Sequence, residues 1–400
     1  MTVSYDPRQP EVIADPYPLF RRLQADDPAH WSDVLGGWVL TRYDDVRMAL
    51  GDARLSADRI TPFVSRRGAQ TTPGLAELAR LVPLWAVFSD PPRHTRLRGL
   101  MNRAFTTRAV ERLRPRIEAI IDELLDRIHG RETFDVMRDF AYPLPITVIA
   151  ELLSVAREER DHFKSWSDEL AGFIGSGLDT PDKYARAGRA MGAMAASFRT
   201  LISERRREPR DDLMSVLIAA EERGDAMSED ELVATGVLLL FAGHETTTNL
   251  IGNAVLALLR HRGEVPRLHA DPAAAVEEFL RYDGPTQAMV RIAGEDVGLH
   301  GRTIRRGDRI FTMIGAANRD PDQFPDPDRL DLQRQPNRHI AFGYGIHFCI
   351  GASLARLEAQ LALPALLARF PALTLPVAQP RWLPSLVFRG VSSLPVRACG

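Results

Sequence analysis

The densest cluster of chemically useful residue types lies late in the 400-residue chain, in the run FGYGIHFCIG at positions 342–351. Glycines lie on both sides of Cys349, and an apolar helical pattern follows. Gly343 permits positive φ and lets the backbone approach a flat group closely, and Gly351 avoids a clash as the helix begins. A cysteine where a helix begins lies near unpaired amides and the positive end of the helix dipole, which favour a thiolate. The run indicates either a ligating thiolate or a buried structural cysteine beside a glycine turn.

A second cluster, FAGHETTT at positions 241–248, interrupts an otherwise apolar helical pattern. Glycine inside a helix costs roughly 1 kcal/mol relative to alanine, so Gly243 requires a reason. Gly243 and Thr246 share a helix face, which would clear room beside a ligand. The Thr246 hydroxyl can bond the carbonyl of Ala242, and Glu245 adds an ionisable group next to it. His244 is interpreted as structural. Alone, this segment could equally be the solvated edge of an ordinary helix.

A third pattern pairs an acid with a base ahead of the cysteine. Glu278 and Arg281 are three residues apart, so both lie on one helix face, although most such pairs are exposed. A proline-rich stretch over residues 318–338 follows and contains Arg329. A loop of this length inside a compact domain is usually functional or a linker.

Taken together and in this order, the three segments resemble the cytochrome P450 family of haem-thiolate monooxygenases. Positions 342–351 match the family's haem-binding loop, Phe-Gly-x-Gly-x-His-x-Cys-x-Gly, and positions 242–246 match its oxygen-activation motif, Ala-Gly-x-Glu/Asp-Thr. The resemblance implies that Cys349 is the axial ligand of the haem iron, because a thiolate there favours O–O cleavage. It also implies that Glu245 and Thr246 deliver protons to dioxygen.

The same resemblance implies which residues surround the cofactor and the substrate. Glu278, Arg281 and Arg329 would form a structural triad, and the long loop would be the family's meander. Haem propionates need cations at fixed positions, and the candidates are His94, Arg98, Arg291 and His347. Further expected cofactor contacts are Phe342, Gly343, Gly351, Ala242 and Gly243. The expected substrate lining is Trp85, Phe88, Leu239, Thr247, Gln287, Met289 and Phe388.

Long helices must position these residues. Apolar residues recurring from Val110 to Ile128 predict one long helix, and similar patterns predict helices over roughly 186–206, 228–261 and 353–369. Strand signals occur at 38–40 and in an alternating hairpin over 297–310. We expect a mainly α protein with a small β portion, as a single cytochrome P450 domain over residues 1–400. Haem would lie between the oxygen-activation helix and the cysteine-loop helix, and residues 1–14 would be loosely ordered.

Composition excludes several functional classes. Apolar residues make up 45% and charged residues 26%, as in an average globular chain. The 51 basic and 53 acidic residues give a net charge of −2, which does not favour nucleic acid. Two cysteines cannot form a disulfide framework, and no signal peptide or membrane-length apolar run is visible. We expect a cytoplasmic protein that binds neither nucleic acid nor membrane.

The resemblance implies a monooxygenase that inserts one oxygen atom from O2 into a bulky apolar substrate, by hydroxylation or epoxidation. The substrate would be a natural product such as a macrolide or polyketide, a steroid or a terpene. The cofactor would be haem b. Because we expect no fused reductase, electrons from NAD(P)H would arrive through a ferredoxin reductase and a small ferredoxin, which would dock on Arg96, Arg103 and Arg356.

Two alternatives remain open. A peroxide-driven hydroxylase of fatty acids could dispense with a proton relay, so the intact Glu245–Thr246 pair disfavours it. A non-catalytic haem-binding sensor or carrier should have lost some of the motif residues, whereas Cys349, Thr246 and Glu278 are all present.

Overall fold

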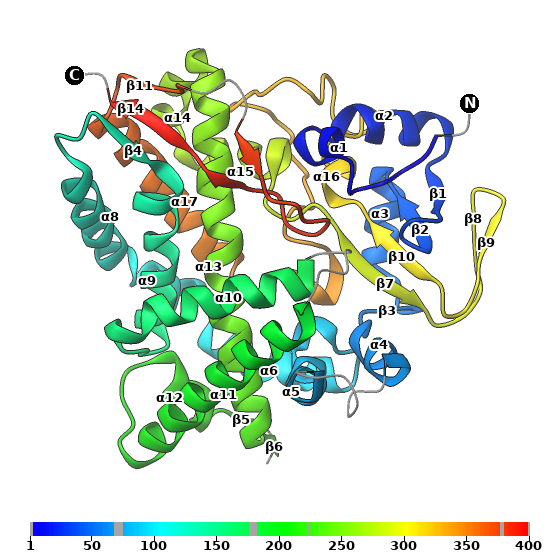
Figure 1. The fold of residues 1–400 in the computed structure, drawn as a ribbon, viewed down its shortest axis with the longest axis horizontal. Helices are drawn as coiled ribbons and strands as arrows, with labels where there is room; N and C mark the ends of the chain where they lie inside the picture. The colour runs from blue at the N-terminus through cyan, green and yellow to red at the C-terminus, as the bar shows by residue number, and fades with distance from the viewer. Residues whose placement is uncertain (1–2, 68–74, 176–181, 223–224, 377–379, 399–400) are drawn as a thin grey trace. The chain divides into compact units, whose positions relative to one another are not determined.

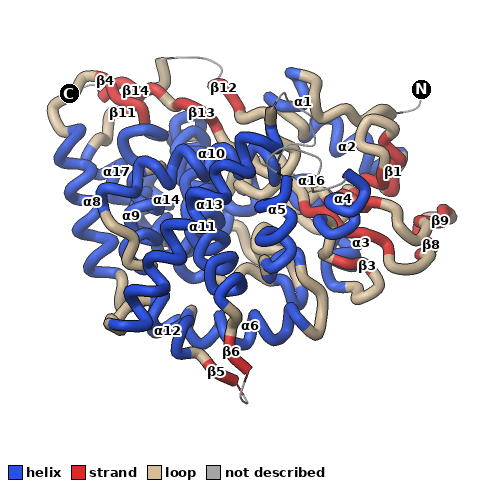
Figure 2. The backbone as a smooth tube through the Cα atoms, turned by 60° about the horizontal axis from the view of Figure 1, so that its bottom comes forward, coloured by secondary structure: helices blue, strands red, loops and turns tan. Residues whose placement is uncertain are grey.

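Helix makes up 59% of the computed structural model, and the strands are short (Figures 1 and 2). The predicted mainly α class with a small β portion is therefore confirmed. The structure describes residues 3–67, 75–175, 182–222, 225–376 and 380–398. The chain divides into two compact units: residues 1–55, 111–145 and 246–400 form the first, and residues 56–110 and 146–245 form the second.

The main sheet of the first unit has five strands in the order β1-β2-β10-β7-β3. Their bounds are β1 (Ala29–Ser32), β2 (Gly37–Leu40), β10 (Arg309–Thr312), β7 (Met289–Ala293) and β3 (Leu55–Ser56). Strand β10 runs parallel to β2 and antiparallel to β7. A separate hairpin joins β8 (Val297–Leu299) to β9 (Arg302–Ile304), and its turn residues His300 and Gly301 both have positive φ, as a tight hairpin turn requires. The strand at 38–40 is thus confirmed. The hairpin expected over 297–310 is confirmed only over 297–304, because β10 pairs with β2 and β7 instead.

Smaller sheets lie near the carboxyl end of the chain. Strand β14 (Pro395–Ala398) pairs with β11 (Leu373–Thr374) and with β4 (Thr133–Asp135), and β12 (Arg381–Trp382) pairs with β13 (Val391–Ser393).

Two helices of the first unit, α8 (Arg114–Ile128) and α17 (Ala352–Arg369), pack side by side (Figure 1). The apolar stripe of α8 is buried, as its spacing predicts. The single helix expected from Val110 is wrong, however, because α7 (Thr107–Glu111) ends before α8 starts. Pro115 lies in the first turn of α8, where its missing N–H costs nothing, but it could not continue a helix from α7. Further helices of this unit include α3 (Tyr43–Gly51), α14 (Val265–Ala270), α15 (Pro272–Asp283) and α16 (Ile314–Ala317), with a π-helical turn at Met137–Ala141.

The structure describes the amino-terminal segment from residue 3, and the expectation that residues 1–14 are loosely ordered stays a prediction. It contains α1 (Pro10–Ala14) and leads into α2 (Tyr17–Asp26). Val3, Tyr5 and Val12 are buried in one apolar cluster with Phe20. Burial of these side chains holds the segment against the first unit.

The second unit is almost entirely helical. It contains α4 (Ile60–Arg67), α5 (Leu75–Leu81), α6 (Arg93–Ala104), α10 (Arg160–Gly175), α11 (Lys183–Arg207) and α12 (Leu213–Ala219), with a small hairpin of β5 (Glu221–Glu222) and β6 (Asp225–Ala226). Helix α11 packs against α10, α12 and α5. Helix α9 (Pro143–Leu152) and the long α13 (Glu229–Arg260) each contribute residues to both units.

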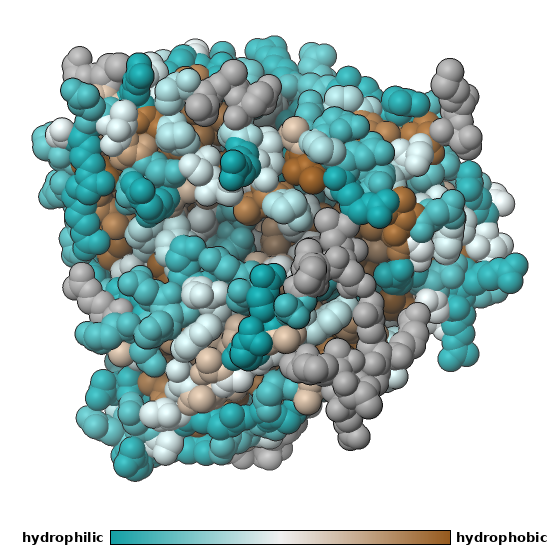
Figure 3. Space-filling view, viewed as in Figure 1, coloured by the Kyte–Doolittle hydropathy of each residue, from teal (hydrophilic) through white to brown (hydrophobic). Residues whose placement is uncertain are grey.

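The face drawn in Figure 3 is mostly hydrophilic, with apolar patches between the polar side chains. No helix among the described residues is long and apolar enough to cross a membrane. The exposed large apolar side chains include Tyr344, Ile346 and Phe348, all in the predicted cysteine loop. That loop is therefore an accessible part of the first unit.

Candidate functional site

The cysteine loop begins at Phe342 and ends where α17 begins. Gly343 (φ +77°) and Gly345 (φ +73°) have left-handed backbone, which explains why glycine occupies these positions. The backbone N–H of Cys349 donates to the carbonyl oxygen of Phe342 at 2.9 Å and closes the loop. The Cys349 side chain is exposed, and Gly351 is the N-cap residue of α17. A thiolate at this position would benefit from the N–H groups and the dipole of the helix start.

Helix α13 is buried almost throughout, and its accessible residues form one face. Over residues 231–258 every residue is buried except Ala242, Gly243, Glu245 and Thr246. Positions 242, 245 and 246 are three and four apart, so they share a helix face. The predicted acid–alcohol pair, Glu245 and Thr246, lies on this accessible face.

Gly243 has a packing role rather than the expected role of clearing room for a ligand. A Cβ atom at this position would lie 2.8 Å from Cγ1 of Ile149 on α9. Glycine therefore lets Ile149 pack directly against the α13 backbone. The expected hydrogen bond from the Thr246 hydroxyl to Ala242 stays a prediction.

His244 is fully buried, on the turn that carries the acid–alcohol pair. Its Nδ1 lies 2.7 Å from the carbonyl oxygen of Leu240, to which it donates. Burial lowers the pKa of His244 to about 4, so the imidazole is neutral near pH 7. A neutral imidazole bonded to the backbone agrees with the structural interpretation.

The four residues expected to bind the propionates are two arginines and two histidines, and each of them is half-buried or buried. In the second unit, His94 is buried and Arg98 is half-buried on α6. In the first unit, Arg291 is buried on β7, and His347 is half-buried in the short turn before Cys349. Long side chains that retain a positive charge away from bulk water suit an anionic group such as a carboxylate. Their convergence on one ligand stays a prediction.

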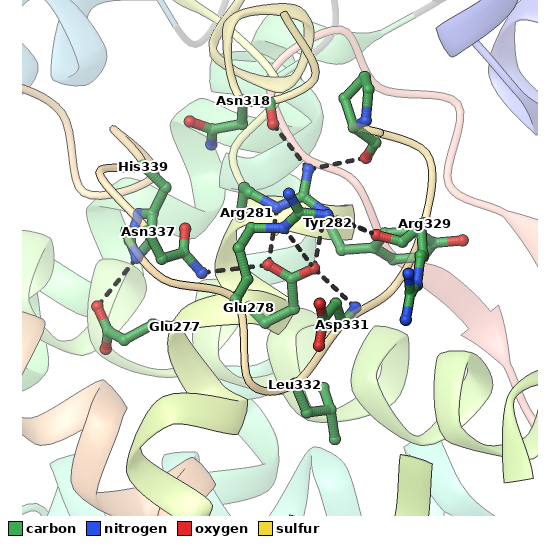
Figure 4. A network of polar contacts seen from close by, with 12 residues as sticks. Glu277, Glu278, Arg281, Tyr282, Asn318, Arg329, Asp331, Leu332, Asn337 and His339 are labelled. Carbon is green, nitrogen blue, oxygen red and sulfur yellow. Dashed lines mark hydrogen bonds and ion pairs between the residues drawn. The ribbon is translucent and has the colours of Figure 1, made fainter. Parts of the chain in front are cut away.

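The predicted Glu278–Arg281 pair is fully buried and forms the centre of a polar network (Figure 4). Arg281 donates from Nε to Oε2 and from Nη2 to Oε1 of Glu278, both at 2.7 Å. It also donates to the carbonyl oxygens of Asn318 and Pro327 at 3.0 and 2.8 Å. Burial lowers the pKa of Arg281, whereas its bonds to Glu278 raise it. The network fixes the long loop after α16 onto α15.

The third member of the predicted triad is wrong. Arg329 contributes only its carbonyl oxygen, 3.2 Å from Arg281 Nη2, and its residue is exposed. The second guanidinium on Glu278 belongs to Arg334, whose Nε lies 3.3 Å from Oε1. Asn337 also donates to Glu278, at 3.1 Å. Several arginines occupy this loop, and sequence spacing alone does not distinguish which of them points inward.

The expected substrate-lining residues occur in both units, and most of them are buried. In the second unit, the Trp85 ring stacks on Phe88 and on Phe241, with both centroids 5.9 Å away, and Leu239 is buried on α13. In the first unit, Thr247 is buried and Met289 is half-buried.

Gln287 and Phe388, which were also expected to line the substrate site, border a cleft of the first unit together with Tyr5, Phe20 and Trp382. This cleft encloses about 30 Å³, room for one or two water molecules, so by itself it does not hold a bulky substrate.

A largely helical fold whose glycine-bounded loop presents a cysteine before a helix has the architecture of a haem-thiolate protein. The family model "Cytochrome P450" matches residues 178–271 and 273–394. Cytochrome P450 107B1 from Saccharopolyspora erythraea is 46% identical over 374 residues, covering 91% of this chain and 89% of that protein. The polyketide biosynthesis cytochrome P450 PksS from Bacillus subtilis is 40% identical over 407 residues, covering 98% of both.

The crystal structure of P450BioI, in complex with acyl carrier protein ligated to hexadec-9Z-enoic acid, is also similar. Its TM-score is 0.90 at 38% identity, covering 97% of this chain and 99% of that one. The chain therefore belongs to the cytochrome P450 family. It is a cytochrome P450 monooxygenase, an oxidoreductase of a family that works with haem, dioxygen and electrons from partner proteins.

Proposed function

We propose that this enzyme inserts one atom of dioxygen into a bulky apolar natural product, with a polyketide or macrolide as the first candidate and steroids and terpenes as others. The reaction would consume substrate, dioxygen, two electrons and two protons, and it would release the hydroxylated or epoxidised product and water. The observation that carries the proposal is the accessible face of α13 formed by Ala242, Glu245 and Thr246, because all other residues over 231–258 except Gly243 are buried.

The chain's own residues would hold haem b and move protons. Haem, when bound, supplies the iron centre that activates dioxygen. Cys349 would bind the iron as a thiolate. Glu245 would take protons from solvent, and the Thr246 hydroxyl would pass them to dioxygen, a role for which general acid catalysis contributes about 10²–10⁴ in rate.

The propionates would be held by Arg291, His347, His94 and Arg98. Arginines bind carboxylates through two parallel hydrogen bonds, which fixes the orientation of the cofactor as well as its charge.

Apolar contact would select the substrate. The Trp85, Phe88 and Leu239 side chains offer no charge to orient a polar molecule, so binding would come from apolar burial at about 25 cal/mol per Å². Similarity to PksS supports a polyketide over a small polar metabolite. Similarity to P450BioI supports a long acyl chain as the competing substrate class.

Electrons from NAD(P)H would arrive through a ferredoxin reductase and a small acidic ferredoxin that docks by charge complementarity. Of the arginines expected at the dock, Arg103 is exposed, and Arg96 forms an ion pair with Glu231. Arg356 forms an ion pair with Glu277 through its Nε and Nη2 atoms. Surface charges of this kind mainly set the association rate, which falls with rising salt.

The test is turnover under ¹⁸O₂ with a surrogate ferredoxin and reductase, using macrolactones, steroids, terpenes and free or carrier-bound fatty acids as substrates. We expect product containing one ¹⁸O atom, with a macrolactone converted fastest. Product from hydrogen peroxide alone, at a rate that the electron chain does not match, would instead support the peroxide-driven alternative. Haem binding without product from any class would support the sensor or carrier.

A further inference from the structure

Phe342, the first residue of the cysteine loop, makes contacts through its aromatic ring as well as through its backbone. The Arg356 guanidinium carbon lies 4.5 Å from the centroid of the Phe342 ring, a cation–π distance. The His339 ring also contacts it, with the centroids 6.3 Å apart. Because the Phe342 carbonyl accepts the N–H of Cys349, a displacement of Phe342 would be transmitted directly to the cysteine backbone.

Glu277 fixes the two groups that hold Phe342. Arg356 donates from Nε to Oε1 and from Nη2 to Oε2 of Glu277, at 2.7 and 2.8 Å. His339 Nε2 donates to the same Oε2 at 3.0 Å (Figure 4). The other ring nitrogen of His339, Nδ1, accepts the N–H of Ala341 at 3.2 Å, so both ring nitrogens are hydrogen-bonded.

This cluster joins three separate parts of the first unit. Glu277 lies on α15, one residue before the buried Glu278. Arg356 lies on α17, and His339 directly follows the long loop of residues 318–338. Burial alone would raise the pKa of Glu277, but the hydrogen bonds from Arg356 and His339 lower it to about 2. The carboxylate therefore remains charged across the working pH range.

We propose that Glu277, Arg356 and His339 form a clamp on Phe342 that positions Cys349 as a metal ligand. The three are positioning residues that act through Phe342, and the inference rests on the proposed role of Cys349. In this arrangement the edge of the Arg356 guanidinium donates hydrogen bonds to Glu277, and its face contacts the Phe342 ring. Its main role is consequently in the loop and not at the ferredoxin dock.

The experiment measures how fast the thiolate-type Soret band of the reduced, carbon monoxide-bound holoenzyme is lost in mild urea. We expect Glu277→Gln and Arg356→Gln to lose the band about tenfold faster than the wild type, the size of one charge-assisted hydrogen bond. The matched control is Arg369→Gln. Arg369 lies on α17, as Arg356 does, and the substitution removes its ion pair with Asp126 on α8. Its rate should stay within about twofold of the wild type.

Two further measurements separate the clamp from other roles of the same residues. Arg356→Lys keeps the charge but not the two-pronged bond, and it should fall between the wild type and Arg356→Gln. Combining Arg356→Gln with Phe342→Leu should accelerate band loss by less than the product of the two single effects, because both act through one contact.

Several outcomes would overturn the proposal. One is band loss in Glu277→Gln and Arg356→Gln as slow as in the Arg369→Gln control. Another is an Arg356→Gln variant with a stable band and a weaker salt dependence of electron transfer, which would assign Arg356 to the ferredoxin dock. If the wild type never formed the thiolate band, the proposed function itself would fail, a result distinct from the failure of the clamp.

Discussion

Replacing Arg334 with alanine should destabilise the protein, whereas the same replacement at Arg329 should not. The two arginines lie five residues apart in one loop, and their side chains are chemically identical. Only Arg334 places it on the buried Glu278 carboxylate, and its side chain is 10% exposed. The pair of variants thus isolates the inward-facing guanidinium from the composition of the loop.

The magnitude follows from the bonds that Arg334→Ala removes. The bond to Glu278 is charge-assisted, and such bonds contribute about 1.5–3 kcal/mol. Arg334 also donates to the carbonyl oxygens of Pro325, Asp326 and Arg329, but water can replace these bonds at the exposed side of the loop. Glu278 retains its two bonds from Arg281, so its charge is still compensated. We expect a loss of about 2–3 kcal/mol for Arg334→Ala and less than about 0.5 kcal/mol for Arg329→Ala.

The assay is urea unfolding of the holoenzyme, followed by far-ultraviolet circular dichroism and by haem absorbance. The midpoint should fall for Arg334→Ala with an unchanged slope, and it should not move for Arg329→Ala. A larger loss for Arg329→Ala than for Arg334→Ala would refute the assignment of the network and restore Arg329 as the third member of the triad.

Three further predictions concern α13. Thr246→Ala should keep reductant consumption but divert it to hydrogen peroxide; an unchanged yield of product per electron would remove Thr246 from the proton path. Gly243→Ala should cost about 1–3 kcal/mol in the free energy of unfolding because the new Cβ meets Ile149 at 2.8 Å. In an Ile149→Ala background, which removes that contact, the same substitution should cost less. Burial lowers the pKa of His244 from 6.5 to about 4. The free energy of unfolding should therefore reach its full value above pH 6.5 and decrease as the pH falls from 6.5 toward 4. The total decrease should be about 3 kcal/mol. His244→Asn should flatten that part of the stability–pH curve, and an identical slope in wild type and variant would show that another group titrates.

The elements with strong periodic patterns could be predicted from the sequence, and so could the glycine positions of the cysteine loop. Helices α13 and α17 lie close to their expected bounds because long apolar runs have few alternatives to burial. The positive φ at Gly343 and Gly345 follows from the one property that glycine alone provides.

The remaining features depend on tertiary contacts that local patterns do not encode. The sequence alone suggests that Gly243 makes space for a ligand. The structure shows that Ile149, nearly one hundred residues earlier in the chain, packs against it. Arg334 and Arg329 are indistinguishable until the fold buries one of them. The packing of the amino-terminal segment is also of this kind, because Tyr5 and Val12 are buried in one apolar cluster with Phe20.

The most direct test of the central claim, that Cys349 is the haem ligand, is the absorbance of the reduced, carbon monoxide-bound protein in two single variants. Cys349→Ser removes the predicted ligand, and Cys399→Ser removes the other cysteine, which lies outside the described residues. We predict that Cys349→Ser loses the red-shifted Soret band of thiolate ligation and that Cys399→Ser keeps it. Retention of that band in Cys349→Ser would show that Cys349 is not the haem ligand.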